Sequence, residues 1–220
     1  PVAMDPLSVN VIQGGKVQPV EISDHCQGQA CQDPSPNYRH KTYYANWDIY
    51  QRKYFVKDLP VRKINEAIYA FINYDKQGNI KLIDPNSDDK ELVELSKLRR
   101  RYPYLNGKLS VGGWTLSADF SAMAANPVSR INFVNQTVKA MHQLNLNGID
   151  IDWEYPVARG GAPGDACHFA LLLEEIHERQ YQLTQQTQQS YSVSIAAPGG
   201  VDKIDIITKD CPSFWQSINE

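Results

Sequence analysis

Five short apolar runs alternate with longer segments of helical period from residue 41 onward, and this alternation limits the possible folds more than any other feature of the chain. Each run is four to six residues long and largely continuous, as in parallel strands that are covered on both faces. The sequence therefore predicts an α/β protein whose helices cross over between parallel strands. The five runs are residues 42–47, 67–72, 108–111, 148–153 and 192–197.

Three of the intervening segments place apolar residues on one helical face. Asn126 followed by Pro127 predicts the N-cap and first turn of the second of these helices. The three predicted faces are Leu92, Leu95 and Leu98; Ile131, Val134, Val138 and Met141; and Phe169, Leu172, Leu173 and Ile176.

Repeated strand–helix units fit either a doubly wound sheet or a (β/α)8 barrel. The chain lacks the Gly-x-Gly-x-x-Gly pattern after an early strand and the Walker-type glycine-rich loop that nucleotide-binding sheets use. Residues 160–164 are glycine-rich and are interpreted as a plain loop. We therefore favour the barrel, of which the 220 residues hold about the first five strands.

Residues 1–39 are rich in Gln, Gly, Pro and Ser and are predicted to form an N-terminal extension or linker, whereas residues 40–220 form the barrel. A formal charge of −3 without a basic stripe lacks the electrostatic footprint that binding to nucleic acid or an anionic membrane requires, so we expect neither as a partner. No apolar run reaches the roughly 18 residues of a membrane span, and no signal peptide is visible.

The four cysteines allow different interpretations. Cys26 and Cys31 are close enough in sequence for a disulfide, whereas Cys167 and Cys211 lie far apart and are equally compatible with buried thiols. His25 beside Cys26 is too small a cluster for zinc, so we expect no metal and no cofactor.

Three carboxylates recur with period two at Asp150, Asp152 and Glu154. Alternate side chains of a strand share a face, so these acids line one side while Ile151 and Trp153 line the other. Burial of unpaired carboxylates is costly, which favours a functional role over a structural one. An edge strand with a solvated acidic face and a hard-metal site are the alternatives.

Glu154 comes last in this run and should lie nearest the C-terminal mouth, where barrel enzymes do their chemistry. Because the three acids form a column of like charges, at least one of them should hold its proton to a higher pH than it would alone. A protonated carboxyl group can act as a general acid, and Glu154 is the candidate.

Aromatic residues gather at or just beyond the predicted strands, and about half of them are expected in the core. Aromatic rings pack well on the apolar faces of sugars, which suggests a carbohydrate cleft. Trp114 is the strongest candidate, because it follows Gly112-Gly113, where a ligand or neighbouring backbone can come close. The candidate sugar-binding residues are Tyr43, Phe71, Trp114 and Tyr155.

Four motifs in order along the chain resemble those of family 18 glycoside hydrolases, the chitinases and their relatives. Between about residues 41 and 198 the motifs are Tyr43-Tyr44-x-Asn46-Trp47, Ala70-Phe71, Ser110-x-Gly112-Gly113-Trp114 and Asp150-x-Asp152-x-Glu154-Tyr155-Pro156.

This resemblance implies an endochitinase that cleaves β-1,4 links next to N-acetylglucosamine, in chitin or its oligosaccharides, with retention of configuration. It implies that Glu154 protonates the leaving oxygen and that the substrate's own acetamido oxygen attacks the anomeric carbon. Asp152 would polarise the acetamido N–H, Asp150 would share charge and proton with Asp152, and Ser110 would support that pair. Tyr43 would lie near the acetamido pocket.

The sequence departs from the family pattern in two respects. Asn147 stands where the longer signature usually begins with Asp, and we expect this exchange to be tolerated. The sixth-strand Met-x-Tyr-Asp motif and the later Trp are absent, so a C-terminal segment or complementary chain is expected to complete the barrel.

The alternatives to a chitinase are a non-catalytic chitin-binding lectin, an inactive fragment, or an enzyme that acts on the chitobiose core of glycoproteins or on peptidoglycan. The substrate class implied by the resemblance points to a secreted, extracellular protein.

Overall fold

The computed structural model describes residues 9–13, 16–20 and 28–218. The strands are β1 (Val9–Gln13), β2 (Lys16–Val20), β3 (Lys41–Ala45), β4 (Glu66–Tyr74), β5 (Ile80–Lys81), β6 (Asn106–Gly112), β7 (Gly148–Asp152) and β8 (Ser192–Ile195). The α-helices are α1 (Pro85–Arg101), α2 (Phe120–Ala125), α3 (Pro127–Gln143), α4 (Asp165–Thr187) and α5 (Val201–Asp210). Short 3-10 helices are η1 (Gly28–Cys31), η2 (Asn46–Ile49), η3 (Val56–Asp58), η4 (Ser117–Asp119) and η5 (Phe214–Ile218).

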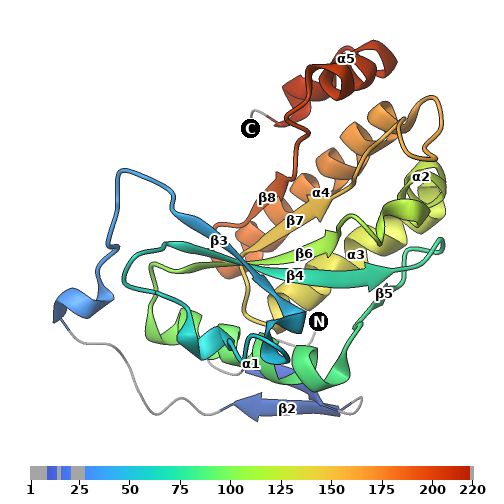
Figure 1. Ribbon diagram of the computed structural model, residues 1–220. Coiled ribbons are helices and arrows are strands. Elements are labelled where there is room, and N and C mark those ends of the chain that lie inside the picture. The colour runs from blue at the N-terminus through green and yellow to red at the C-terminus, as the bar shows by residue number, and fades with distance from the viewer. Residues whose placement is uncertain (1–8, 14–15, 21–27, 219–220) are drawn as a thin grey trace. The chain divides into compact units, whose positions relative to one another are not determined.

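The main sheet has the hydrogen-bonded order β3-β4-β6-β7-β8, which is also the order of these strands along the chain, with β5 pairing with β4 (Figure 1). β3 and β4 pair in parallel, with Lys41 opposite Glu66 and Ala45 opposite Ala70. Helices α1, α3 and α4 connect successive strands. The five predicted strands and the α/β class are therefore confirmed, and the short β5 is an addition.

The N-terminal region contains a two-stranded antiparallel sheet of β1 and β2, with Val9 opposite Val20. The division into an extension of residues 1–39 and a barrel of residues 40–220 stays a prediction. Cys26 lies outside the described residues, whereas Cys31 is part of a disulfide.

The chain forms two compact units: residues 1–70, 82–109 and 140–148 make one, and residues 71–81, 110–139 and 149–220 make the other. In the first unit, two buried acids of α1 bind groups from the strands and loops. Asp88 accepts a hydrogen bond from the Tyr69 hydroxyl at 2.6 Å, and Glu91 accepts one from the backbone N–H of Val56 at 2.6 Å. These acids replace water as partners for buried donors.

A second polar group of the first unit lies at the start of the sheet. Glu66 and Lys108 have side chains that are 1% and 4% exposed, and their charged atoms lie 3.6 Å apart. Asn147 accepts a hydrogen bond from the backbone N–H of Gly107 at 2.9 Å and donates one to the Asn106 side chain. Asn147 thus joins the starts of β6 and β7 through neutral hydrogen bonds.

The core of the second unit contains a row of aromatic rings. The centroid distances along it are 4.3 Å from Tyr74 to Phe120, 5.2 Å from Phe120 to Trp153, 5.2 Å from Trp153 to Phe169 and 5.4 Å from Phe169 to Phe214. Trp153 is therefore a core residue, as its alternation with the carboxylates predicts.

Helix α3 begins as predicted, because the Asn126 side chain accepts the backbone N–H of Val128 at 2.9 Å and Pro127 occupies the first turn. The buried face holds Val134, Val138 and Met141, but the expectation for Ile131 is wrong, since its side chain is 52% exposed. Phe133, which the predicted face did not include, is fully buried.

The interpretation of Cys167 and Cys211 as possible buried thiols is also wrong, because they form a disulfide with Cα atoms 5.1 Å apart. Asp210, beside Cys211, accepts the backbone N–H groups of Gly164 at 2.7 Å and Ala166 at 2.9 Å. The end of α5 therefore caps the start of α4, and this folding brings together two cysteines that are 44 residues apart.

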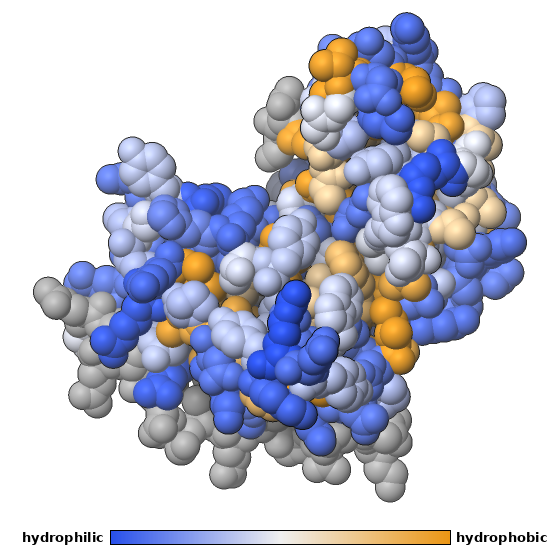
Figure 2. Space-filling model, in the orientation of Figure 1, coloured by the Kyte–Doolittle hydropathy of each residue, from blue (hydrophilic) through white to orange (hydrophobic). Residues whose placement is uncertain are grey.

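Helix α5 also presents apolar residues to solvent. Val201 is 72% exposed and Ile206 is 38% exposed. Figure 2 shows hydrophobic side chains gathered over this helix. None of the helices in the described part of the chain has the length and apolar character that crossing a bilayer requires.

Replacement of both Cys167 and Cys211 by Ser should lower the free energy of unfolding by roughly 2–4 kcal/mol, because the cross-link restricts a long loop of the unfolded chain. Urea denaturation of the double variant measures this difference, with Ser213→Ala near the bridge as control. Equal stability of the double variant and the unsubstituted protein would contradict the prediction.

Candidate active site

Strand β7 and the residues just after it carry the three predicted carboxylates, which belong to the second unit. Asp150 and Asp152 are 1% and 6% exposed, and the neighbouring Ile149 and Ile151 are fully buried on the other side of the strand. Glu154 lies two residues beyond the end of β7 and is half-buried. The alternation read from the sequence is thus present, and the solvated edge-strand alternative is wrong, because β7 lies between β6 and β8.

Asp150 is held by hydroxyl groups from both neighbouring strands. Ser110 of β6 donates to Asp150 Oδ2 at 2.8 Å, and Ser194 of β8 donates to Asp150 Oδ1 at 2.5 Å. Ser110 was singled out in the sequence and lies where it can support Asp150. Ser194 was missed, although its alternation with Val193 and Ile195 in a short apolar run was a usable signal.

Asp152 has a strongly perturbed acidity. Its pKa is raised from the ordinary value of 3.8 to about 7, chiefly by burial, then by the charges of Glu154 and Asp150, and by a hydrogen bond with the Glu154 side chain. The sequence predicted such a rise for at least one of the three acids from their like charges, but burial is the larger cause for Asp152. Its Oδ1 atom is buried and has no hydrogen-bond partner among the described residues.

Tyr155 follows Glu154 and contacts it. Burial, the charge of Glu154 and a hydrogen bond with the Glu154 side chain raise the pKa of the Tyr155 hydroxyl, whereas the charge of Arg159 lowers it. The Tyr155 hydroxyl thus stays protonated at neutral pH and is available as a donor beside Glu154. The peptide bond between these two residues is cis.

Gly112 and Gly113 let the end of β6 approach β7 closely. Their φ angles are +110° and +95°, which side-chain-bearing residues rarely adopt. A Cβ atom on Gly112 would collide with the carbonyl oxygen of Asp152, and one on Gly113 would lie 2.9 Å from the ring of Phe71. The predicted close approach is therefore real, and Phe71 is brought to the end of β6.

Trp114 follows these glycines and is 58% exposed. The guanidinium carbon of Arg159 lies 3.3 Å from the centroid of the Trp114 ring, so the cation covers one face of the indole. Arg159 was missed because it lies in a loop without a recognisable motif. Its Nη1 atom is also 3.4 Å from the carbonyl oxygen of Glu154.

The loop of residues 157–164, which carries Arg159, is organised by one buried carboxyl group. Asp165 is 1% exposed and accepts the backbone N–H groups of Val157 at 3.2 Å and Ala162 at 2.7 Å. It also accepts the Ser121 hydroxyl at 2.7 Å. The glycine-rich residues form a loop, as predicted, and this loop is held against α2 and α4.

Tyr43 belongs to the first unit, where it lies on β3 and is 49% exposed. Its predicted place near an acetamido pocket stays a prediction. Among the described residues, no three His, Cys, Asp or Glu side chains are arranged to hold a metal ion.

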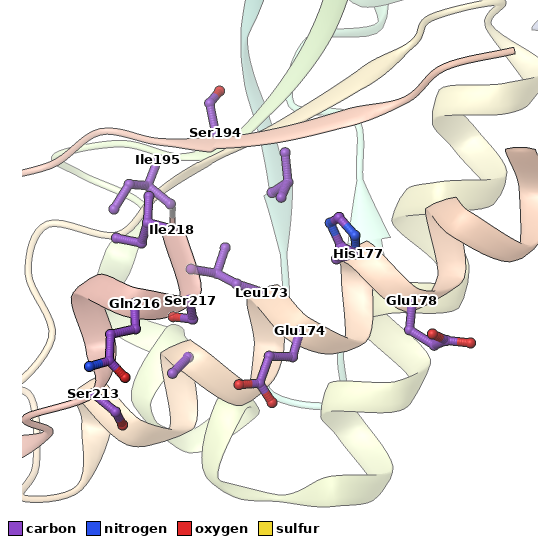
Figure 3. Close-up of a pocket in the computed structure, with 12 residues that line it drawn as sticks. Leu173, Glu174, His177, Glu178, Ser194, Ile195, Ser213, Gln216, Ser217 and Ile218 are labelled. Atoms are coloured by element: carbon purple, nitrogen blue, oxygen red, sulfur yellow. The ribbon is translucent and has the colours of Figure 1, made fainter. Parts of the chain in front are cut away.

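A pocket of about 340 Å³ lies between α4, β8 and η5 (Figure 3). Its lining includes Leu173, His177, Ile195 and Ile218, and Figure 3 shows Ser194 pointing away from α4. Ser194 therefore faces Asp150 on the other side of β8. The pocket does not include the three carboxylates.

Replacement of Asp152 by Asn should change the pH dependence of stability. The folded chain holds the Asp152 proton to about pH 7 and the unfolded chain only to about pH 4, so this group destabilises the fold progressively between these values. Asp152→Asn should therefore increase the free energy of unfolding at pH 8 by up to about 4 kcal/mol, and much less at pH 4.

Urea denaturation at the two pH values measures this effect, and Asp205→Asn on the exposed side of α5 is the control. The same stability difference between Asp152→Asn and the unsubstituted protein at pH 4 and pH 8 would contradict it.

Comparison with known proteins identifies a family and several similar chitinases. The family model of glycosyl hydrolases family 18 matches residues 39–219. The chain is 30% identical to Endochitinase 1 of Metarhizium robertsii, over 84% of this chain and 46% of that protein. It is 35% identical to Probable chitinase 2 of Drosophila melanogaster, over 62% of this chain and 30% of that protein.

Solved structures give the same result. The chain matches the Group IV chitinase of Ostrinia furnacalis in complex with allosamidin with a TM-score of 0.68 and 28% identity, over 74% of this chain and 44% of that chain. The fold is therefore part of a (β/α)8 barrel, and the chain spans less than half the length of these relatives. Because the family model matches most of the sequence, the chain belongs to glycosyl hydrolase family 18.

Proposed function

We propose that the whole protein hydrolyses β-1,4 links of chitin or N-acetylglucosamine oligosaccharides by a retaining, substrate-assisted mechanism. The observation that carries the proposal is the buried Oδ1 of Asp152, which lacks a hydrogen-bond partner among the described residues. The same carboxyl group forms a hydrogen bond with the Glu154 side chain. A buried acceptor without a partner is costly unless a ligand satisfies it. The acetamido N–H of a bound sugar supplies such a donor.

In the first step, Glu154 gives its proton to the glycosidic oxygen, and the bond between that oxygen and the anomeric carbon breaks. The substrate's acetamido oxygen forms a new bond to the anomeric carbon, and the acetamido N–H donates to Asp152. In the second step, water attacks the anomeric carbon, its proton passes to Glu154, and the ring formed by the acetamido group reopens. Two inversions at one carbon give retention.

Electrostatics supports this division of roles. Ser110 and Ser194 both donate to Asp150, so the buried Asp150 carboxyl group has partners for both oxygens. The charges of Asp150 and Glu154 raise the pKa of Asp152 to about 7, after the larger effect of burial. A proton held within this coupled group near neutral pH is the reserve that a general acid needs.

The substrate class rests on the comparisons and on the aromatic residues. Two of the relatives carry the names Endochitinase 1 and Probable chitinase 2, and one matched chitinase structure contains allosamidin. The Trp114 ring is 58% exposed, and Arg159, which covers one of its faces, lies 3.4 Å from the carbonyl oxygen of Glu154. An exposed indole ring linked in this way to the candidate acid suits a sugar ring. Phe71 and Tyr43 are further proposed contacts.

Completion of the barrel and an extracellular location belong to the same proposal. Because the matched relatives are more than twice as long as the aligned part, the activity is proposed for the whole protein, with a further segment or a complementary chain closing the barrel. The Cys167–Cys211 disulfide supports an oxidising, extracellular environment.

Replacement of Glu154 by Gln should reduce turnover of a fluorogenic chitooligosaccharide by roughly 10³-fold, because the amide cannot donate a proton to the leaving oxygen. Binding of chitooligosaccharide, measured by calorimetry, should stay within a few-fold. Glu174→Gln, on the exposed side of α4, is the matched control and should keep full turnover. Undiminished turnover in Glu154→Gln would refute the mechanism, and binding without turnover by the unsubstituted protein would favour the lectin.

Replacement of Trp114 by Ala should raise the KM for chitooligosaccharides by roughly 3- to 10-fold with a smaller change in kcat, because a ring face that packs on the sugar is lost. Tyr181 on α4 is the control, since its exposed fraction of 56% is close to the 58% of Trp114. Equal KM values for the Trp114→Ala and Tyr181→Ala variants would show that Trp114 does not contact the sugar.

A further inference from the structure

One serine hydroxyl joins the end of β6 to the end of β7. Ser117, the first residue of η4, is 9% exposed, and its Oγ accepts the backbone N–H of Glu154 at 2.8 Å. The same oxygen lies 3.0 Å from the carbonyl oxygen of Gly113 and 3.2 Å from that of Asp152. A hydroxyl carries one proton, which it can donate to either carbonyl.

The chain around Ser117 explains how the hydroxyl reaches this position. The backbone N–H of Gly113 donates to the carbonyl oxygen of Asp152 at 2.8 Å, which holds the two strand ends together. The N–H of Leu116 then donates to the carbonyl oxygen of Gly113 at 3.0 Å, so the backbone turns back and Ser117 returns to the strand ends. Residues 112–117 therefore form one turn that presents a hydroxyl to β7.

The backbone of Glu154 depends on this hydroxyl because β7 ends at Asp152. The Glu154 N–H donates to Ser117, and its carbonyl oxygen lies 3.4 Å from Arg159, at the weak limit of a hydrogen bond. Displacement of the Glu154 carboxyl group by about 1 Å is enough to lower the rate of the chemical step by about two orders of magnitude. Proton transfer needs this carboxyl group within hydrogen-bond reach of the leaving oxygen.

We propose that Ser117 is a positioning residue for Glu154, which acts by fixing the backbone between the paired carboxyl groups of Asp152 and Glu154. This inference rests on the proposed function for the identity of Glu154 as the acid. The Ser117 hydroxyl hydrogen-bonds to backbone atoms of Gly113, Asp152 and Glu154, and its effect should therefore appear in the chemical step rather than in sugar binding.

The test uses the full protein with Ser117→Ala, which removes the hydroxyl, and Ser117→Thr, which keeps it. Ser117→Ala should lower kcat for a fluorogenic chitooligosaccharide by roughly 10- to 100-fold and leave KM within about 3-fold. Ser117→Thr should recover most of the loss. Ser129→Ala is the matched control, because Ser129 is 6% exposed and its hydroxyl also donates to backbone carbonyls, those of Met123 and Asn126.

Hydrogen exchange at the Glu154 amide gives a readout that is independent of turnover. Loss of its acceptor in Ser117→Ala should speed exchange by about 10-fold or more, whereas Ser129→Ala should leave it unchanged. If the unsubstituted protein turns over substrate and Glu154→Gln does not, wild-type kcat in Ser117→Ala overturns the inference and leaves the proposed function intact.

If Ser117→Ala and Ser129→Ala lose kcat equally, the effect is general destabilisation and the inference is overturned. If the unsubstituted protein shows no turnover, the proposed function fails. Hydrogen exchange at the Glu154 amide then tests whether Ser117 fixes this part of the backbone. Faster exchange in Ser117→Ala then supports a role for Ser117 in fixing this backbone, and unchanged exchange overturns it.

Discussion

Burial of the Asp150 and Asp152 carboxyl groups within the sheet is the constraint around which the second unit is organised. Two buried charges side by side would be costly, and the unit reduces this cost in two ways. Serine hydroxyls from the flanking strands satisfy both oxygens of Asp150. Asp152 keeps a proton to about pH 7 and shares a hydrogen bond with Glu154. The Asp152 carboxyl group thus holds a proton beside Glu154, the candidate acid.

The backbone beyond the strands serves the same arrangement. Gly112 and Gly113 bring the end of β6 against the carbonyl oxygen of Asp152, and Ser117 returns to hold the amide of Glu154. On the other side, Asp165 organises the loop that carries Arg159, and Arg159 covers one face of Trp114. Asp210 and the Cys167–Cys211 bridge fix the start of α4, where this loop ends. Each of these contacts limits the freedom of residues after a strand has ended.

Prediction from the sequence succeeded where a local pattern has a direct structural cause. Continuous apolar runs corresponded to the strands, the Asn126-Pro127 pair to the start of α3, and the alternation of Asp150 with Ile151 to the two faces of β7. It failed where partners come from distant parts of the chain. Cys167 and Cys211 bond because α5 folds back onto the start of α4. Ile131 is 52% exposed although it shares a helical face with the buried Val134.

The sequence alone determined the strand–helix alternation, the three carboxylates on one face, the paired glycines and the family, because each depends on residues close together in the chain or on motifs in fixed order. The tertiary structure decided which groups surround those carboxylates. Ser194 reaches Asp150 only because β8 lies beside β7, and Ser117 reaches Glu154 only because the chain turns back after β6. Hydrogen bonds act over about 3 Å, so partners from separate segments are fixed only when folding brings those segments together.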